Sequence, residues 1–334
     1  MALHRRSSST ADGPPEYRGL LDAIVESGSD PSVRLIFADW LDEHDRPHEA
    51  ELMRLHVALL ATCCEPDKHP ERIRQQGRIV ELLAAGVRPC LPQHRIALAK
   101  GVDMTFAWIP PGTFLMGSPP GEPERGEDEK QHRVTLSQGF YLGMHAVTQA
   151  QWQAVMGDNP SSFKGKNRPV EQVSWDDCQE FLTKLSQRDG KRYGLPTEAE
   201  WEYACRAGTT TPFHFGVTIA TEQANYNGNY PYNKGTKGID REQTTPVGSF
   251  PPNAWGLFDM HGNVWEWCQD EYRPYGQINT KNILEIENMD EIARVLRGGS
   301  WYTLAWYCRA ADRFRLAPRR NGYDFGFRVA LRLD

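Results

Sequence analysis

The most informative segment of the sequence is Asn253-Ala-Trp-Gly-Leu-Phe-Asp-Met-His-Gly-Asn-Val-Trp-Glu-Trp267. Trp255, Trp265 and Trp267 bring large, rigid apolar side chains to it, and side chains of this kind dominate the cores they enter. Gly262 interrupts the segment, so we expect no long helix or strand to run through it. The segment therefore predicts an aromatic core in a region that is poor in long strands.

The same composition extends from Val102 to the end of the chain. Aromatic residues, glycine and proline become frequent, apolar runs shorten and turn signals recur, which is typical of short strands joined by long ordered loops. Two helices are expected here, over 175–187 and 197–207. The second begins with Thr197-Glu-Ala-Glu200, a capping box in which each end residue bonds to the backbone amide of the other.

Residues 17–95 follow a helical pattern instead. Apolar side chains recur at helical spacing, and Asp30 can cap a second helix that has Pro31 at its first position. Gly86 and the two prolines after it predict a linker. The expected helices cover residues 17–25, 31–41, 49–63 and 71–85, after a disordered tail over residues 1–16.

Two short motifs in this helical part carry no assigned chemistry. Arg34-Leu-Ile-Phe-Ala-Asp-Trp-Leu-Asp-Glu43, followed by Glu51-Leu-Met-Arg-Leu-His56, resembles a helical module that recurs beside other domains in planctomycete proteins, which implies a docking or packing element.

His44 and His48 have a spacing that can bind iron or zinc on one face of a helix. Pro47 lies between them and would disrupt that helix, so we expect a surface loop.

The composition is that of an ordinary globular protein. The 334 residues are 39% apolar and 25% charged, with a net charge of -6, and no apolar run reaches the roughly 18 residues that a membrane span needs. The mild acidity argues against nucleic acid as the partner. Seven dispersed cysteines and an N-terminus without an apolar signal segment indicate free thiols in a cytoplasmic protein.

Six sequence blocks follow one another in a fixed order within residues 102–334. They are Ile109-Pro-Pro-Gly-Thr-Phe-Leu-Met-Gly-Ser118, Pro169-Val-Glu-Gln-Val-Ser-Trp-Asp176, Leu195-Pro-Thr-Glu-Ala-Glu-Trp-Glu-Tyr-Ala204, the segment 253–267, Arg297-Gly-Gly-Ser-Trp301 and Gly326-Phe-Arg-Val329. Together they resemble the sulfatase-modifying-factor family, also called the formylglycine-generating-enzyme family. The resemblance implies an α+β fold, a C-type-lectin-like variant with little regular secondary structure, preceded here by a small all-α module.

The resemblance also implies structural calcium ions that hold loops together. The residues implied are Asp259, Gly262, Val264 and Glu266 for one site, and Asn225, Tyr226 and Asp240 for a second. Carboxylate, amide and carbonyl oxygens are the ligands that calcium prefers. A hydrogen-bonded turn without a metal is the alternative.

The oxidase chemistry that the resemblance implies depends on two cysteines. Enzymes of the family use copper and oxygen to convert a substrate cysteine to formylglycine, and their two active cysteines follow Gly-Gly-Ser-Trp. Cys308 occupies the second position in this chain, but Thr303 occupies the first. A hydroxyl is a hard ligand and cannot replace the thiolate that Cu(I) favours. We therefore expect Cys308 to be a buried structural thiol, and we keep the copper-dependent oxidase as the alternative.

The segment 302–325 predicts a binding function. Its 24 residues include no Lys, Glu, Gln or Met, and in this it resembles variable proteins of diversity-generating retroelements. Aromatic side chains offer large contact areas at a low entropy cost. The predicted ligand-binding residues are Tyr302, Thr303, Leu304, Trp306, Tyr307, Asp312, Phe314, Leu316, Tyr323, Asp324 and Phe325. A divergent loop in an inactive family member is the alternative.

The charge of the C-terminal part indicates the kind of partner. Residues 294–334 hold nine arginines and three aspartates, which favours an unknown protein or another acidic ligand, unless the arginines pair inside the fold. We therefore interpret the chain as a ligand- or protein-binding protein rather than an enzyme. In a third interpretation it is a scaffold whose N-terminal helices dock a partner.

Overall fold

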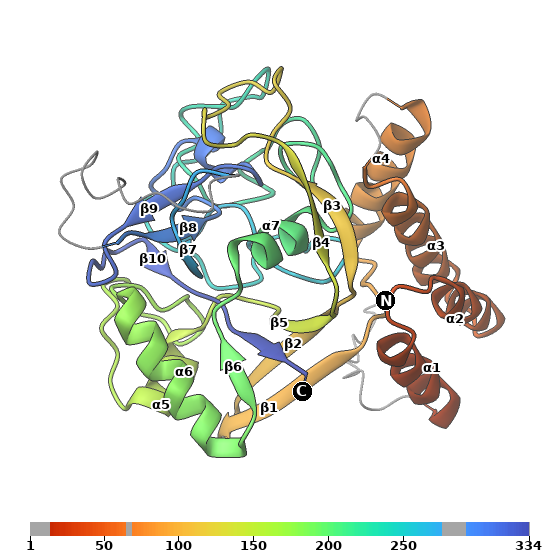
Figure 1. Ribbon diagram of the computed structural model, residues 1–334, viewed down its shortest axis with the longest axis horizontal. Helices are drawn as coiled ribbons and strands as arrows, with labels where there is room; N and C mark the ends of the chain where they lie inside the picture. Colours follow the sequence, from red (N-terminus) through yellow and green to blue (C-terminus); the bar gives the residue numbers. More distant parts are fainter. Residues whose placement is uncertain (1–13, 65–68, 276–291, 334) are drawn as a thin grey trace, which may run out of the picture.

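The computed structural model describes residues 14–64, 69–275 and 292–333. Four helices open the chain, as the sequence predicts (Figure 1). They are α1 (Pro15–Glu26), α2 (Ser32–Glu43), α3 (Pro47–Ala61) and α4 (Pro70–Ala84). α2 begins one residue later than predicted, so that Pro31 and not Asp30 is its N-cap, and Asp30 Oδ1 accepts a hydrogen bond of 2.9 Å from the Ser32 amide. Residues 1–13 of the predicted tail 1–16 lie outside the described residues, and α1 already begins at Pro15.

His44 and His48 do not share a helical face. His44 ends α2 and stacks on Trp40 with the ring centroids 3.7 Å apart, whereas His48 lies in the first turn of α3, which Pro47 begins. The proline thus separates two helices. Within residues 14–64, 69–275 and 292–333, no three His, Cys, Asp or Glu side chains gather in a way that could hold a metal ion.

A five-stranded sheet with the strand order β1-β2-β5-β11-β6 forms the base of the second part. Its strands are β1 (Gln93–Ala99), β2 (Val102–Ile109), β5 (Phe140–Gly143), β6 (Arg192–Gly194) and β11 (Ala330–Arg332). The sheet therefore begins before the boundary predicted at Val102, because β1 pairs antiparallel with β2 and places His94 opposite Phe106. The burial of the side chains alternates from Gln93 to Leu98, as expected for a strand with one covered face.

Two smaller sheets carry the C-terminal loops. The strands are β3 (Gly112–Met116) and β4 (His132–Leu136) in one, and β7 (Trp265–Glu271), β8 (Arg294–Arg297), β9 (Phe314–Leu316) and β10 (Phe325–Gly326) in the other. The second has the order β10-β7-β8-β9. The predicted variable segment 302–325 thus supplies the edge strand β9 and the first residue of β10. Its first part, between β8 and β9, contains the 3-10 helix Ala305–Cys308, and residues 317–324 form the loop between β9 and β10.

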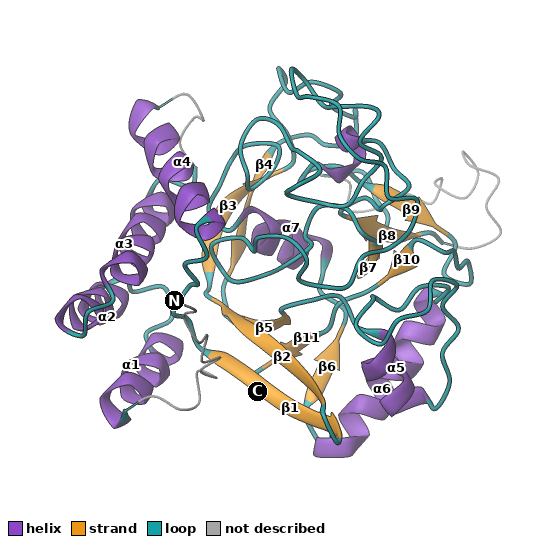
Figure 2. Cartoon of the chain, turned by 180° about the vertical axis from the view of Figure 1, so that it is seen from behind, coloured by secondary structure: helices purple, strands orange, loops and turns teal. Residues whose placement is uncertain are grey.

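Three further helices begin at capping boxes. They are α5 (Gln149–Met156), α6 (Trp175–Asp189) and α7 (Glu198–Arg206), capped by Thr148, Ser174 and Thr197. The helices α6 and α7 were predicted from the sequence, whereas α5 was not. Figure 2 shows α1 to α4 along one side of the sheets and α5 and α6 on the other. Across the described ranges, no helix is both long enough and apolar enough to cross a membrane.

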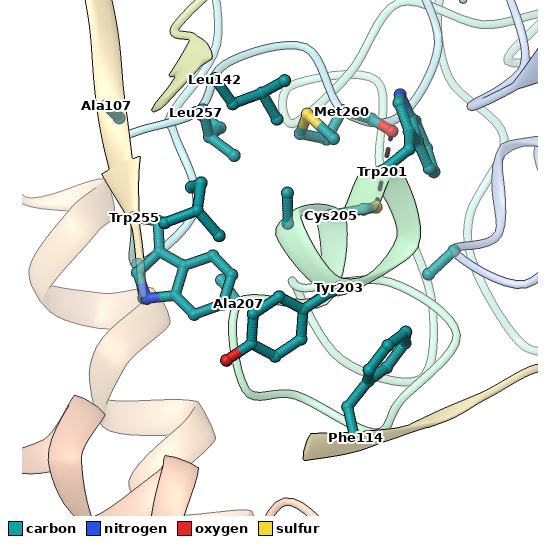
Figure 3. Packing of buried hydrophobic residues seen from close by; sticks show 14 of the residues in the cluster. Ala107, Phe114, Leu142, Trp201, Tyr203, Cys205, Ala207, Trp255, Leu257 and Met260 are labelled. Carbon is teal, nitrogen blue, oxygen red and sulfur yellow. Dashed lines mark hydrogen bonds between the residues drawn. The ribbon is translucent and has the colours of Figure 1, made fainter. Parts of the chain in front are cut away.

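One hydrophobic core joins the N-terminal helices to the sheets. Leu52 and Leu59 of α3 and Leu83 of α4 belong to the same buried cluster as Trp255 and Tyr203. The indole of Trp255 meets the Tyr203 ring edge to face, with centroids 4.8 Å apart (Figure 3). The prediction that the tryptophans serve as packing is confirmed for Trp201, Trp255 and Trp267, all three of which are fully buried. The helical module is therefore packed against the rest of the chain through its apolar faces.

Candidate functional site

Two glycines position the loop that carries Cys308. Gly298 and Gly299 have φ angles of 96° and 72°, in the left-handed region that side chains with a Cβ rarely adopt. A Cβ on Gly299 would lie 2.5 Å from Cys308 Sγ and 3.0 Å from the Tyr307 carbonyl oxygen. The glycine therefore lets the backbone approach the thiol closely, and the short 3-10 helix Ala305–Cys308 follows.

Cys308 faces a hydroxyl rather than a second thiol. Its Sγ lies 3.8 Å from Thr303 Oγ1 and 4.0 Å from the Leu304 carbonyl oxygen. The side chain is fully buried, and burial raises the pKa of the thiol to about 12. A single thiol beside a hard hydroxyl does not fit Cu(I), which favours two thiolates. Thr303 and Cys308 therefore do not supply the two thiolates that the copper site implied by the family resemblance requires.

The predicted ligand-binding residues differ widely in exposure. Tyr302, Tyr307, Tyr323 and Phe314 are exposed, with 59%, 42%, 42% and 37% of their surface accessible. Thr303, Leu304, Trp306, Leu316 and Phe325 are half-buried, and Asp312 and Asp324 are buried. The tyrosines therefore dominate the accessible part of the segment.

Tyr302 and Tyr323 form an exposed pair over Trp301. Their ring centroids lie 5.9 Å apart, and those of Trp301 lie 5.4 Å from Tyr302 and 5.6 Å from Tyr323. Two contacts fix the position of Trp301. Its Nε1 donates a hydrogen bond of 3.2 Å to the Tyr323 carbonyl oxygen, and its ring packs edge to face against the ring of Phe163. Phe163 comes from a distant loop, and no local pattern in the sequence marks it as part of this cluster.

Asp312 and Asp324 do not face solvent as binding residues would. Asp324 accepts a hydrogen bond of 2.8 Å from Ser300 Oγ, and Asp312 Oδ1 lies 3.5 Å from the guanidinium of Arg309. Burial raises the pKa of both carboxyl groups. These two aspartates therefore serve the framework beneath the tyrosines, in contrast to their predicted role as ligand contacts.

Most of the C-terminal positive charge is paired inside the fold. The buried Arg309 bonds to Glu122 and Glu129 at 2.8 Å and 2.7 Å, and Arg313 bonds to Glu198 at 2.6 Å. Arg297–Glu202, Arg328–Glu266 and Arg332–Glu200 are further pairs, so five of the nine arginines bond to a carboxylate of the fold. The arginines thus act mainly within the structure, which was the alternative to an acidic partner. Arg319 and Arg320 are exposed.

The first predicted calcium site is only partly consistent with the geometry. Both oxygens of Glu266 bond to the Arg328 guanidinium, at 2.7 Å and 2.8 Å, and Oε2 also accepts from Trp201 Nε1 at 2.6 Å. The Gly262 carbonyl accepts from the Val264 amide. Asp259 differs, because its Oδ1 is buried and has no hydrogen-bond partner among the described residues. Glu266 therefore does not fit a metal ligand here, whereas Asp259 keeps an oxygen that a hard cation could satisfy.

The residues of the second predicted calcium site have separate partners. Asn225 Nδ2 donates to the Gln243 carbonyl at 2.9 Å, and its Oδ1 is buried without a partner in the described ranges. Asp240 instead accepts from the Glu242 amide and from Asn229 at 3.2 Å and 3.3 Å. The hydroxyl of Tyr226 donates to the Ile219 carbonyl at 3.0 Å. The described contacts do not join Asp240 to Asn225.

Comparison with known proteins identifies the family. Residues 99–333 match the family model of the sulfatase-modifying factor enzyme 1-like domain. The chain belongs to this family. It is 32% identical over 241 residues to the chaperone protein LppX of Paenibacillus barcinonensis, covering 59% of this chain and 81% of that protein. It is 34% identical over 212 residues to the formylglycine-generating enzyme of Mus musculus, covering 60% of this chain and 53% of the enzyme. The chain thus spans about half the length of the mouse enzyme.

Solved structures support the same fold. Treponema denticola variable protein 1 has a TM-score of 0.60 and 27% identity, over 72% of this chain and 99% of that one. PvdO from Pseudomonas aeruginosa has a TM-score of 0.58 and 28% identity, over 72% and 98%. The predicted α+β fold, a C-type-lectin-like variant of the formylglycine-generating enzyme preceded by helices, is confirmed. The relatives include both an enzyme and a variable protein, so family membership alone does not assign the function.

Proposed function

We propose that this chain binds a ligand or a protein partner through its C-terminal loops. The contact surface consists of the exposed side chains Tyr302, Tyr307 and Tyr323, which we name the tyrosine surface. The observation that carries the proposal is the Tyr302–Tyr323 pair, which is exposed and yet held in place by the buried Trp301 beneath it. Rigid aromatic side chains of this kind lose little entropy on binding.

The state of Cys308 supports binding over oxidation. Catalysis by a thiol requires the thiolate, and burial holds the pKa of Cys308 at about 12. Thr303 supplies a hydroxyl where a second thiol would be needed. Burial raises the pKa of the Cys308 thiol more than the hydrogen bond with Thr303 lowers it, so the thiol stays protonated.

A display experiment tests the binding function directly. A phage library of random peptides is selected on the purified chain, and the enriched clones are then measured against a Tyr302→Ala/Tyr323→Ala variant. We expect the clones to lose binding to this variant and to keep it towards Glu222→Gln, an exposed control. Equal binding to the double variant would show that the tyrosine surface is not the contact site.

The second candidate is a formylglycine-generating oxidase, which the similarity to the mouse enzyme favours. The test is mass spectrometry of a Cys-x-Pro-x-Arg peptide after incubation with the chain, Cu(I) and oxygen. The binding proposal predicts no conversion of the peptide cysteine. Conversion to an aldehyde that disappears in Cys308→Ser would establish the oxidase instead.

We further propose that segment 302–325 is diversified, as in variable proteins of retroelements. The similarity to Treponema denticola variable protein 1 supports this, as does the missing set of residue types. Sequencing codons 302–325 across a cell population tests it. Codon variation no greater there than elsewhere in the gene would refute diversification and leave the binding function standing.

Calcium and a reducing compartment complete the proposal. The unpartnered oxygens of Asp259 and Asn225 support a structural calcium ion at one of these residues. All seven cysteines are free, which supports a cytoplasmic location. If calcium is structural, adding a chelator lowers the melting temperature of the wild type and has a smaller effect on Asp259→Asn. The absence of any chelator effect would exclude the ion.

A further inference from the structure

Cys63 and Cys64 are the two cysteines of the chain that reach the surface. Both are half-buried, whereas the other five are buried, and none of the seven forms a disulfide. Their sulfur atoms lie 3.7 Å apart, just after the last residue of α3. No family motif covers this pair, because the family model begins at residue 99.

We propose that Cys63 and Cys64 together bind one soft, monovalent metal ion, namely Cu(I) or Ag(I). Two thiolates are soft donors and suit an ion of this class. A metal–sulfur bond measures about 2.3 Å, so two sulfurs can span at most about 4.6 Å around one ion. The observed separation of 3.7 Å lies inside this limit. At this separation one ion can contact both sulfur atoms.

The number of donors argues against a divalent metal. Structural zinc takes four ligands in a closed site. Among the residues that the structure describes, no third His, Cys, Asp or Glu side chain joins the two thiols. Two thiolates match the low coordination number of soft monovalent ions.

The charge of the surroundings fits the same ion. One monovalent cation bound by two thiolates carries a net charge of −1. The buried guanidinium of Arg72 lies at this end of α3, where it donates to the Thr62 carbonyl oxygen at 2.5 Å and to Thr62 Oγ1 at 2.7 Å. Its charge acts on Cys63, where it lowers the pKa of the thiol against the stronger, raising effect of burial. The positive charge of Arg72 would thus favour the anionic complex.

Binding replaces one structural contact by another. The Cys63 thiol donates a hydrogen bond of 2.7 Å to the Thr113 carbonyl oxygen on β3. When the ion binds, each thiol gives up its proton to the solvent and its sulfur donates a lone pair to the metal, so that M⁺ + 2 RSH gives [M(SR)₂]⁻ + 2 H⁺. No electron is transferred. The affinity therefore rises with pH, as expected for any site that must lose protons to bind a metal.

The test is anaerobic titration of the full chain with Cu(I) in the presence of the competing chelator bicinchoninate. We expect one ion per chain in the wild type and in Cys308→Ser, and none in Cys63→Ser or Cys64→Ser. In Cys63→Ser the hydroxyl can still donate a hydrogen bond to the Thr113 carbonyl oxygen. We therefore expect Cys63→Ser and Cys64→Ser to keep the wild-type melting temperature.

Alkylation supplies a second readout that does not depend on stoichiometry. Iodoacetamide should modify Cys63 and Cys64 in the metal-free chain, and Cu(I) should protect both, as followed by peptide mass spectrometry. Copper that stays bound in Cys63→Ser and Cys64→Ser, or that leaves both thiols reactive, would overturn the proposal. Neither readout depends on the tyrosine surface.

Discussion

Replacing Glu266 by glutamine separates an ion-pair role from a metal-ligand role. Glu266 is 1% exposed and bonds to Arg328 through both oxygens. Glu266→Gln leaves the Arg328 guanidinium buried without its counter-charge, and removing one partner of such a pair costs about 3–5 kcal/mol. This is a large part of the roughly 5–15 kcal/mol by which a typical protein is stable.

The assay is urea unfolding followed by tryptophan fluorescence, with and without calcium. If each molar of urea lowers the free energy of unfolding by about 3 kcal/mol, the midpoint should fall by about 1 M or more. The ion-pair role predicts the same loss in calcium and in chelator. Glu222→Gln, at an exposed position, should leave the midpoint unchanged.

A second substitution checks the cause of the loss. Arg328→Met in the Glu266→Gln background removes the uncompensated charge, so the double variant should be more stable than Glu266→Gln alone. The reasoning would be refuted by a loss below about 1 kcal/mol, or by a loss that occurs only when calcium is present. The latter result would restore Glu266 as a calcium ligand.

Three further predictions concern the loop, the surface and the acid stability. Gly299→Ala should cost about 2–5 kcal/mol, combining left-handed strain with overpacking against Cys308, and Cys308→Ala in the same chain should recover part of this loss in urea unfolding. Tyr302→Ala and Tyr323→Ala should each change the free energy of unfolding by less than about 1 kcal/mol, because the side chains are exposed; a larger loss would indicate that the tyrosines are structural. Burial lowers the pKa of His56 in the folded chain to about 3. The unfolded chain therefore binds a proton on His56 more tightly than the folded chain does, and the free energy of unfolding decreases as the pH falls below 6.5. His56→Leu should remove about 2 kcal/mol of this loss at pH 5, and an unchanged pH profile of the variant would contradict the burial argument.

Local signals were enough to predict several elements. The capping boxes at Ser174 and Thr197 mark the starts of α6 and α7, and the same signal, read at Thr148 and Gln151, would have identified α5. Capping boxes depend on residues three apart, which is why a single sequence reveals them. The early start of the sheet has no such signal, because Gln93, His94 and Arg95 are all polar and only their burial in the structure alternates.

The burial of the predicted site residues could not be predicted in this way. Asp312 resembles a surface residue in the sequence, yet it lies beside Arg309, whose partners Glu122 and Glu129 come from about 180 residues earlier in the chain. Glu266 likewise finds its partner at Arg328, 62 residues later. Ion pairs between residues so far apart in the chain produce no periodic or local sequence pattern. Only the structure therefore shows which residues of the segment 302–325 are buried and which are exposed.

The core shared by α3, α4 and the Trp255 region has a consequence for how the chain can be divided. Cutting the chain before β1 would expose the apolar faces around Trp255 and Tyr203 that Leu59 and Leu83 now cover, and large exposed apolar patches promote aggregation. A fragment beginning at residue 93 is therefore a poor reagent for studying the C-terminal loops. Heating the whole chain should instead give one calorimetric transition, in which the helices and the sheets melt together.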